Sequence, residues 1–167
     1  MITSTSSSQV KHVVNLQKKA KLRKEEKQFV VEGVKMVSEA PADRLVKVYV
    51  SETFKADNEE FLERMNYDSI GKDVLEIVTD NVFMRMADTQ TPQGIMAVVR
   101  MTDTDLEGIL SDKHNPLLLI IENLQDPGNL GTIVRMAEGA GVTGIIMSSN
   151  TVDIYNPKTI RSTMGSL

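Results

Sequence analysis

Residues 122–142, ENLQDPGNLGTIVRMAEGAGV, place an amide and a guanidinium six positions apart after an aliphatic run. The amide is Asn129 and the guanidinium is Arg135, while Gly128 and Gly131 bracket the amide. A glycine-bearing turn from the carboxyl end of a strand into a helix presents backbone N–H groups to an anion. In open α/β sheets this crevice is the usual ligand position. The segment therefore predicts either a ligand-binding loop or a plain strand-to-helix turn.

The helix expected over 129–140 holds its arginine outside its apolar stripe. At 100° per residue, Arg135 lies roughly opposite the stripe, toward the loop mouth or solvent. Asn129 stands at the helix start, where its side chain is able to cap free amides. Geometry alone leaves a ligand role and simple capping both open. The stripe comprises Leu130, Ile133, Val134, Ala137 and Ala140.

Several named sites are excluded by residue types. The G-x-G-x-x-G dinucleotide fingerprint is absent, since the loop offers only Gly128 and Gly131, and no G-K-[ST] ending of a phosphate loop follows. There is no cysteine, and the two histidines, His12 and His114, lie far apart without paired-ligand spacing. We therefore expect no disulfide and no metal site.

Charge is divided unevenly along the chain. The net charge is −4, but residues 1–35 carry eight Lys and Arg against three Glu, a net +5. A basic leading segment on an acidic body favours local contact with a polyanion, although a solvated helix face gives the same pattern. Lys158 and Arg161, three apart near the end of the chain, leave the same two interpretations open. The basic candidates are Lys11, Lys18, Lys19, Lys21, Arg23 and Lys24.

Helices alternating with short strands predict an α/β fold. We interpret residues 1–100 as one domain, 101–116 as a connector and 117–167 as part of a second domain. Leading residues MITSTSSSQ lack the pattern of a signal peptide, and no apolar run is long enough to span a membrane, so a cytoplasmic protein is expected. Expected helices are 9–22, 29–40, 56–66, a short one after Thr79, 129–140 and 157–166; expected strands are 45–50, 74–78, 95–99, 117–121 and 143–147.

The loop segment resembles the first signature motif of the SpoU (TrmH-like) RNA 2′-O-methyltransferases. That motif carries an asparagine and, six positions later, an arginine, which match Asn129 and Arg135. Residues 152–167, VDIYNPKTIRSTMGSL, are similar to the segment that follows it. FVVEG (29–33) and TPQGIMAVV (91–99) resemble the family's N-terminal substrate-binding domain, so the likeness covers nearly the whole chain.

The resemblance implies an L30e-like α/β RNA-binding domain followed by the first part of a SPOUT-type, α/β-knot methyltransferase domain. It implies S-adenosylmethionine as cofactor, structured RNA (rRNA in particular) as partner, and a homodimer. Catalytic roles are implied for Arg135 and Asn129, and the basic residues become candidates for phosphate contacts. An arginine stays protonated and offers no acceptor, so we expect it to hold phosphate or ribose and stabilise a developing alkoxide rather than act as a base.

Two further family motifs, which tie the knotted cofactor pocket, are not found in this sequence. We therefore expect a truncated chain without cofactor-binding residues of its own, inactive by itself. Two alternatives stay open: a non-catalytic L30e-like RNA-binding module, and an interaction protein that uses an unfinished sheet edge.

Overall fold

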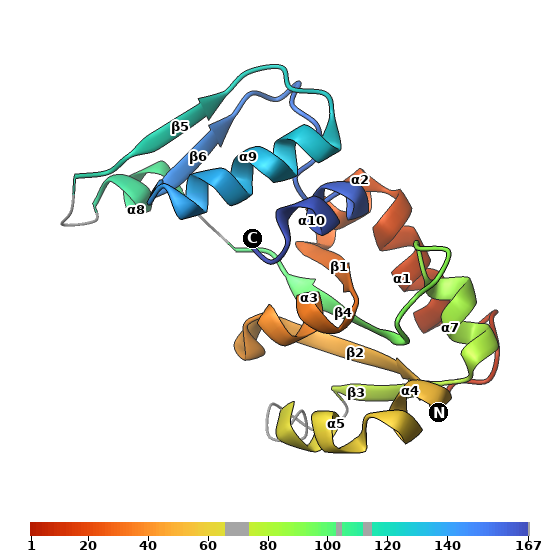
Figure 1. Ribbon diagram of the computed structural model, residues 1–167. Coiled ribbons are helices and arrows are strands. Elements are labelled where there is room, and N and C mark those ends of the chain that lie inside the picture. The colour runs from red at the N-terminus through yellow and green to blue at the C-terminus, as the bar shows by residue number, and fades with distance from the viewer. Residues whose placement is uncertain (66–73, 103–104, 112–114, 167) are drawn as a thin grey trace. The chain divides into compact units, whose positions relative to one another are not determined.

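The computed structural model describes residues 1–65, 74–102, 105–111 and 115–166. The chain divides into two compact units, Met1–Met101 and Thr102–Leu167, and each builds its own β-sheet (Figure 1). Within the described ranges, none of the helices combines the length and apolar character that a bilayer span requires.

Unit 1 is built on a four-stranded mixed sheet with the order β1-β4-β2-β3. The last strand in sequence, β4, is central and runs antiparallel to both β1 and β2, whereas β2 and β3 are parallel. Parallel neighbours end at the same edge of the sheet, so the segments that follow β2 and β3 lie together. The strands are β1 (Gln28–Glu32), β2 (Leu45–Ser51), β3 (Leu75–Val78) and β4 (Ile95–Arg100).

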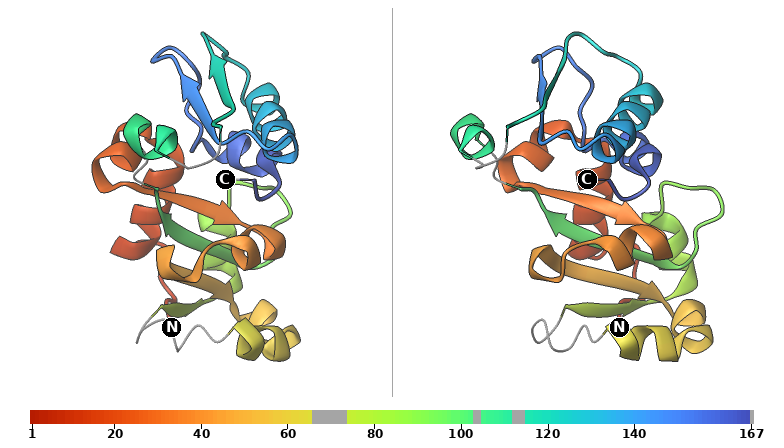
Figure 2. Two further views of the ribbon diagram at one scale, coloured as in Figure 1. Left: turned by 90° about the vertical axis from the view of Figure 1, so that its left-hand side faces the viewer. Right: turned by 60° about the vertical axis from the view of Figure 1, so that its left-hand side comes forward.

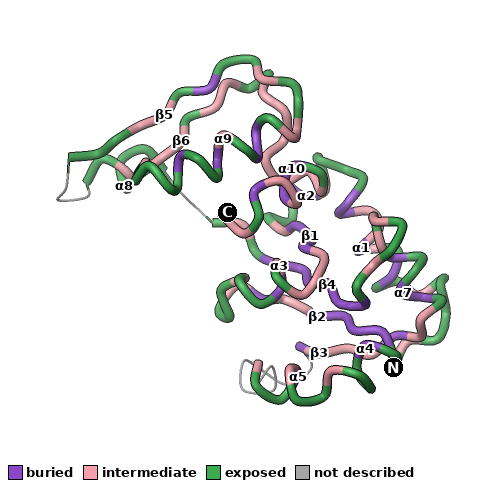
Figure 3. The backbone as a smooth tube through the Cα atoms, in the orientation of Figure 1, coloured by how far each residue is buried: buried purple, intermediate pink, exposed green. Residues whose placement is uncertain are grey.

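Helices cover this sheet on both sides, and Figure 2 shows α1 and α7 across the sheet from α3. Valines at 10 and 13 and a leucine at 16 give α1 a buried stripe that packs with α7 on Val30, Tyr49 and Met96 of the sheet. Burial of one such side chain contributes about 1.5–3 kcal/mol, so this core anchors α1 firmly (Figure 3). The helices are α1 (Ser8–Lys18), α2 (Ala20–Glu26), α3 (Val34–Glu39), α4 (Glu52–Asp57), α5 (Glu59–Met65) and α7 (Asp80–Met86), with a short 3-10 helix η1 (Ala42–Arg44).

The helix expected over 29–40 is wrong for its first half. Phe29, Val30 and Val31 are all buried in β1, a strand covered on both faces, so a continuous apolar run was mistaken for helical spacing. Gly33 has φ +100, a conformation that favours glycine, and it turns the chain from β1 into α3. The second half, α3, is confirmed.

Two other expected helices are each divided by a break. The helix over 9–22 is interrupted at Lys19, whose backbone is extended between α1 and α2. The helix over 56–66 is replaced by α4 and α5, which Asn58 separates; residue 66 lies outside the described residues. The expected strands of this unit and the short helix after Thr79 are confirmed, with boundaries shifted by at most about one residue.

Unit 2 is a two-stranded parallel sheet, β5 (Leu118–Ile121) and β6 (Gly144–Met147), crossed by α9 (Pro127–Gly139). One face packs on α9 through Ile121, Leu130 and Val134. On the other face, Ile120 is 73% exposed. The strands and helices expected in this region are confirmed; α10 (Pro157–Thr163) completes it, and α8 (Leu106–Leu110) forms within the segment expected to be a connector.

Asp80 ties the segment after β3 to the start of α4. Its carboxylate accepts hydrogen bonds from the Thr53 backbone N–H at 3.2 Å and from Thr53 Oγ1 at 2.6 Å. The hydroxyl hydrogen bond is the main cause that lowers the pKa of Asp80 below its ordinary value of 3.8. The ionised carboxylate therefore stabilises the fold above that value.

We expect acid to weaken unit 1 partly through Asp80. Because the folded-state pKa is lowered, its contribution is complete above the ordinary value and is lost as the pH falls through the folded pKa. The thermal midpoint measured at about pH 6 and about pH 3 should therefore change less in Asp80→Asn than in the unsubstituted protein. The control is Glu52→Gln, which removes an exposed carboxylate from the start of α4. If both substitutions change the pH dependence equally, the stabilising role assigned to Asp80 is contradicted.

Candidate functional site

Asp126, rather than Asn129, caps the amino end of α9. Asp126 Oδ1 accepts a hydrogen bond from the Asn129 backbone N–H at 2.7 Å. Pro127 occupies the first helical turn, where the chain has no need of its missing N–H. Of the two roles left open for Asn129, capping of the helix is therefore excluded, because α9 begins two residues before it. The side chain of Asn129 is exposed and is left for another role.

The loops that follow β5 and β6 are joined into one rim at the carboxyl ends of these parallel strands. The Asn123 backbone N–H donates to Ser148 Oγ at 2.9 Å. The side-chain amide of Gln125 donates to the Asn150 carbonyl. Asn123 itself has φ +54, which asparagine tolerates better than most residues. The loop that leads to α9 is therefore fixed by the neighbouring strand, not only by its own turn.

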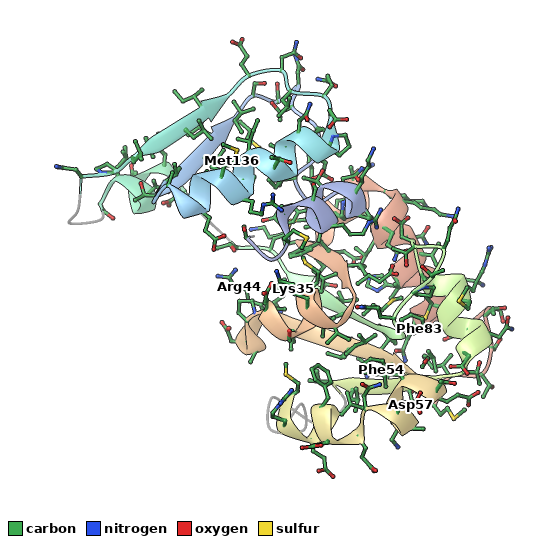
Figure 4. The ribbon with its side chains drawn as sticks, in the orientation of Figure 1. Lys35, Arg44, Phe54, Asp57, Phe83 and Met136 are labelled. Carbon is green, nitrogen blue, oxygen red and sulfur yellow. The ribbon has the colours of Figure 1, made fainter. Side chains whose placement is uncertain are left out.

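Arg135 points away from the core of unit 2, as the helical spacing predicts. It is exposed, and so is the next residue, Met136, which is 67% exposed on α9 (Figure 4). Six residues of helix place Asn129 and Arg135 about 9 Å apart along the axis and about 120° apart around it. The two signature residues thus lie on different flanks of α9, and this helix does not by itself bring them to one point.

Gly131 allows α10 to pack directly on α9. A Cβ at Gly131 would lie 1.8 Å from Ser162 Oγ and 2.8 Å from the Ser162 carbonyl carbon. Ser162 Oγ also donates to the carbonyl of Pro127 at 3.1 Å. The second glycine of the loop therefore serves helix packing. Arg135 follows Gly131 by one turn, so it lies on the flank of α9 that faces toward α10.

The basic candidates on α1 and α2 do not form one uniform set. Arg23 is 2% exposed, and its Nη1 donates to the carbonyls of Leu16 at 2.6 Å and Gln17 at 2.9 Å. Its assignment as an RNA contact is therefore corrected: it satisfies carbonyls at the carboxyl end of α1, where the helix stops. The exposed members are Lys11, Lys18, Lys19, Lys21 and Lys24.

Of the exposed lysines, Lys11 and Lys18 lie two turns apart on one side of α1. Lys21 is 3.7 Å from Glu25, a pair on the surface of α2. On α10, Lys158 is exposed and Arg161 is half-buried. The structure therefore supports a basic strip on α1 more clearly than a basic face on α10.

Two segments of unit 1 that are far apart in sequence meet at the turn from β1 into α3. Gln93 Oε1 accepts from the Val34 N–H at 2.8 Å, and Glu32 Oε2 accepts from the Asp88 N–H at 3.0 Å. A Cβ on Gly33 would lie 2.8 Å from Gln93 Oε1. FVVEG and TPQG, which each resemble the family's first domain, thus form a single clamp. Sequence reasoning named both segments but did not place them together.

Comparison with known proteins assigns both units. Residues 7–97 match the MRM3-like substrate binding domain, and residues 116–167 match the SpoU rRNA Methylase family. The first match alone covers more than half of the chain. The chain therefore belongs to the family of MRM3-like substrate-binding domains, and its second unit matches the SpoU rRNA Methylase family. The predicted family and fold class are both confirmed.

Individual relatives agree with this assignment. The chain is 33% identical over 163 residues to the mitochondrial rRNA methyltransferase 3 of Homo sapiens, covering 92% of this chain and 36% of that protein. It is 35% identical over 169 residues to an uncharacterized tRNA/rRNA methyltransferase of Synechocystis, and the match covers 99% of this chain and 58% of that protein. The chain thus spans between about a third and three fifths of these relatives.

Solved structures give the same result for the fold. The AdoMet-bound rRNA methyltransferase from Sinorhizobium meliloti matches with a TM-score of 0.81 and 26% identity, over 99% of this chain and 60% of that one. The SpoU methyltransferase AviRb from Streptomyces viridochromogenes matches with a TM-score of 0.76 and 25% identity, over 96% of this chain and 58% of that one.

Proposed function

We propose that these 167 residues are the RNA-facing part of an rRNA 2′-O-ribose methyltransferase. The observation that carries the proposal is the exposed Arg135 on α9, the helix that follows the fixed rim after β5, within a segment that matches the SpoU family. Relatives named as rRNA methyltransferases support the same substrate class. Unit 1 then binds the RNA, and unit 2 positions the ribose that is modified.

The reaction would transfer a methyl group from a sulfonium to a ribose 2′-oxygen, which must lose its proton. Arg135 offers five N–H donors and no acceptor, so it is suited to hold a phosphate or the ribose and to stabilise negative charge on the 2′-oxygen. Asn129, on another flank of α9, would orient the loop or the ribose. Positioning of the two reacting atoms supplies much of the rate in such a displacement.

S-adenosylmethionine is the methyl donor that the family and the AdoMet-bound neighbour support. The described residues of unit 2 do not fit this group well. Polar groups on the rim bond to one another, as in the Asn123–Ser148 and Gln125–Asn150 pairs, and the outer side of β5 presents Ile120 to solvent. We therefore propose that residues other than these hold the cofactor.

A homodimer is part of the proposal. Asn129 and Arg135 lie on different flanks of α9, and pairing two copies would allow one site to use both residues. Sedimentation equilibrium that reports a monomer at every concentration tested would exclude it. The cytoplasmic location stays a prediction, since the relatives include proteins named as mitochondrial.

RNA binding should depend on the lysine strip of α1. Each lost phosphate contact lowers the slope of log K against log salt by about 0.9, or about 0.7 on single strands. We expect Lys11→Gln/Lys18→Gln to weaken binding of an rRNA transcript about tenfold and to lower that slope by about 1.5. Fluorescence anisotropy across a salt series measures both quantities.

The matched control is Lys55→Gln, which removes an exposed lysine from α4. It should leave the affinity within about twofold and the salt slope unchanged. If Lys55→Gln weakens binding as much as the α1 pair, RNA contacts are spread over the surface and the α1 strip is not the binding site. If neither variant nor the unsubstituted chain binds RNA, the proposed function fails.

A further inference from the structure

Unit 1 has a groove that the proposed RNA function does not use. It begins as a cavity of about 310 Å³ at the carboxyl ends of β2 and β3, between α4, α7 and the segment before β4. A second cavity of about 250 Å³ adjoins it along α5, and Asp57 and Asn58 line both. We call the two together the α4–α7 groove.

The floor of the groove is aromatic and its wall is acidic. Phe54 and Phe83 are 6% and 2% exposed beneath the first cavity, and Phe61 lines the second; Figure 4 labels Phe54, Asp57 and Phe83 at this end of unit 1. Asp57, Asp80 and Glu60 supply carboxylates. Such a combination of ring faces and carboxylates suits a cation that carries an apolar stem.

One guanidinium of the protein itself, that of Arg64, already lies over an aromatic ring of the groove. Arg64 lies 5.9 Å from the centroid of the Phe61 ring, and Phe61 in turn meets Phe54 edge to face at 6.1 Å. On the opposite rim, Met84 is 53% exposed, an adaptable apolar side chain that borders the first cavity. The groove therefore offers an apolar contact for an aliphatic stem at one end and a working cation–aromatic contact at the other.

The charge of the helices beside the groove indicates which class of ligand it binds. Helices α4 and α5 carry five acidic residues and two basic ones, a net charge of −3. A phosphate backbone would be repelled here, so substrate RNA is a poor occupant. Asp80 accepts two hydrogen bonds from Thr53 and one from the side chain of Ser51, and since a carboxylate has about four acceptor sites, it retains one for another donor.

We propose that the α4–α7 groove docks an extended, arginine-bearing segment of a partner protein. A guanidinium binds between the carboxylates of Asp57 and Asp80 in the first cavity, and its stem packs on Phe54 and Met84. Glu60, in the second cavity, adds negative charge along the bound segment. This surface is separate from the lysines of α1 and α2, so the protein is able to bind RNA and the partner through different helices.

The probe is a short fluorescein-labelled peptide in which arginine alternates with glycine, and its citrulline analogue is the neutral comparison. We expect the arginine peptide to bind and the citrulline peptide to bind at least about fivefold more weakly, since citrulline keeps the shape and loses the charge. Asp57→Asn/Glu60→Gln should weaken the arginine peptide about fivefold. Asp80 is left intact because it holds Thr53.

Glu52→Gln/Glu63→Gln is the matched control, because both carboxylates are exposed on the same helices and neither lines the groove. It should change affinity by less than about twofold. Equal weakening by the two double variants, equal binding of the citrulline peptide, or no binding at all would overturn the proposal.

A second readout does not depend on how the variants fold. The methyl carbon of Met84 should shift in a ¹³C spectrum when the arginine peptide is added to the unsubstituted protein, whereas the methyl of Met136 in unit 2 should not. A shift at Met136 alone would place the peptide elsewhere and contradict the proposal. RNA affinity measured in parallel separates failure of this inference from failure of the proposed function.

Discussion

Gly131→Ala should destabilise unit 2 by about 2–3 kcal/mol, because the added methyl group overlaps α10. The added Cβ would meet Ser162 Oγ at 1.8 Å, Ser162 Cβ at 2.6 Å and the Ser162 carbonyl carbon at 2.8 Å. A side chain alone could rotate away, but a backbone atom moves only if α10 moves. Amide hydrogen exchange at Leu130 and Val134 in α9 measures the loss.

The same helix supplies the control. A Cβ on Gly139 meets no heavy atom within 4 Å, so Gly139→Ala should stabilise α9 by about 0.5–1 kcal/mol through reduced chain entropy. Adding Ser162→Gly to Gly131→Ala removes two of the three contacts and should recover part of the loss. If Gly131→Ala and Gly139→Ala have the same effect, the close packing of α10 on α9 is not what Gly131 provides.

Arg135→Ala should reduce methyl transfer to rRNA by at least about 100-fold, the typical cost of removing one donor aimed at developing negative charge. Arg135→Lys should still lose at least about tenfold, because a lysine keeps the charge but not the planar set of donors. The measurement is single-turnover transfer of a labelled methyl group from S-adenosylmethionine to rRNA. It is made with a preparation in which the unsubstituted protein is shown to be active.

Stability separates this effect from simple unfolding. Because Arg135 is exposed, Arg135→Ala should change the free energy of unfolding by no more than about 0.5 kcal/mol, and cofactor binding measured by calorimetry should be unchanged. Arg85→Ala removes an exposed arginine from α7 and should leave turnover intact. Near-normal turnover of Arg135→Lys would rule out the requirement for a planar guanidinium.

Local patterns were sufficient to predict most of the elements, because each depends on residues close in sequence. The helical stripe placed Arg135 outside the core of unit 2 correctly, and Asn156 with Pro157 correctly marked the start of α10. The pattern failed at 29–40, where a strand buried on both faces has the same apolar run as a buried helix. Only pairing with β4 distinguishes the two, and β4 begins about sixty residues later in the chain.

The site was harder to predict for the same reason. Glycine spacing suggested a turn at Gly131, but its role is set by Ser162 on another helix. Charge suggested that Arg23 contacts RNA, but the carbonyls at the end of α1 take its donors. Neither partner is visible from the local sequence. The groove over Phe54 and Phe83 likewise exists only where three segments meet.

The position of β4 in the sheet also governs how unit 1 can be made. This central strand is the last of the four to leave the ribosome, and both β1 and β2 need it as their antiparallel neighbour. Until β4 has emerged, β1 has no strand to pair with. Assembly of the complete sheet is thus delayed to the end of the domain's synthesis, so a nascent chain of this unit carries β1 unpaired, and β2 without its antiparallel neighbour, for most of its translation.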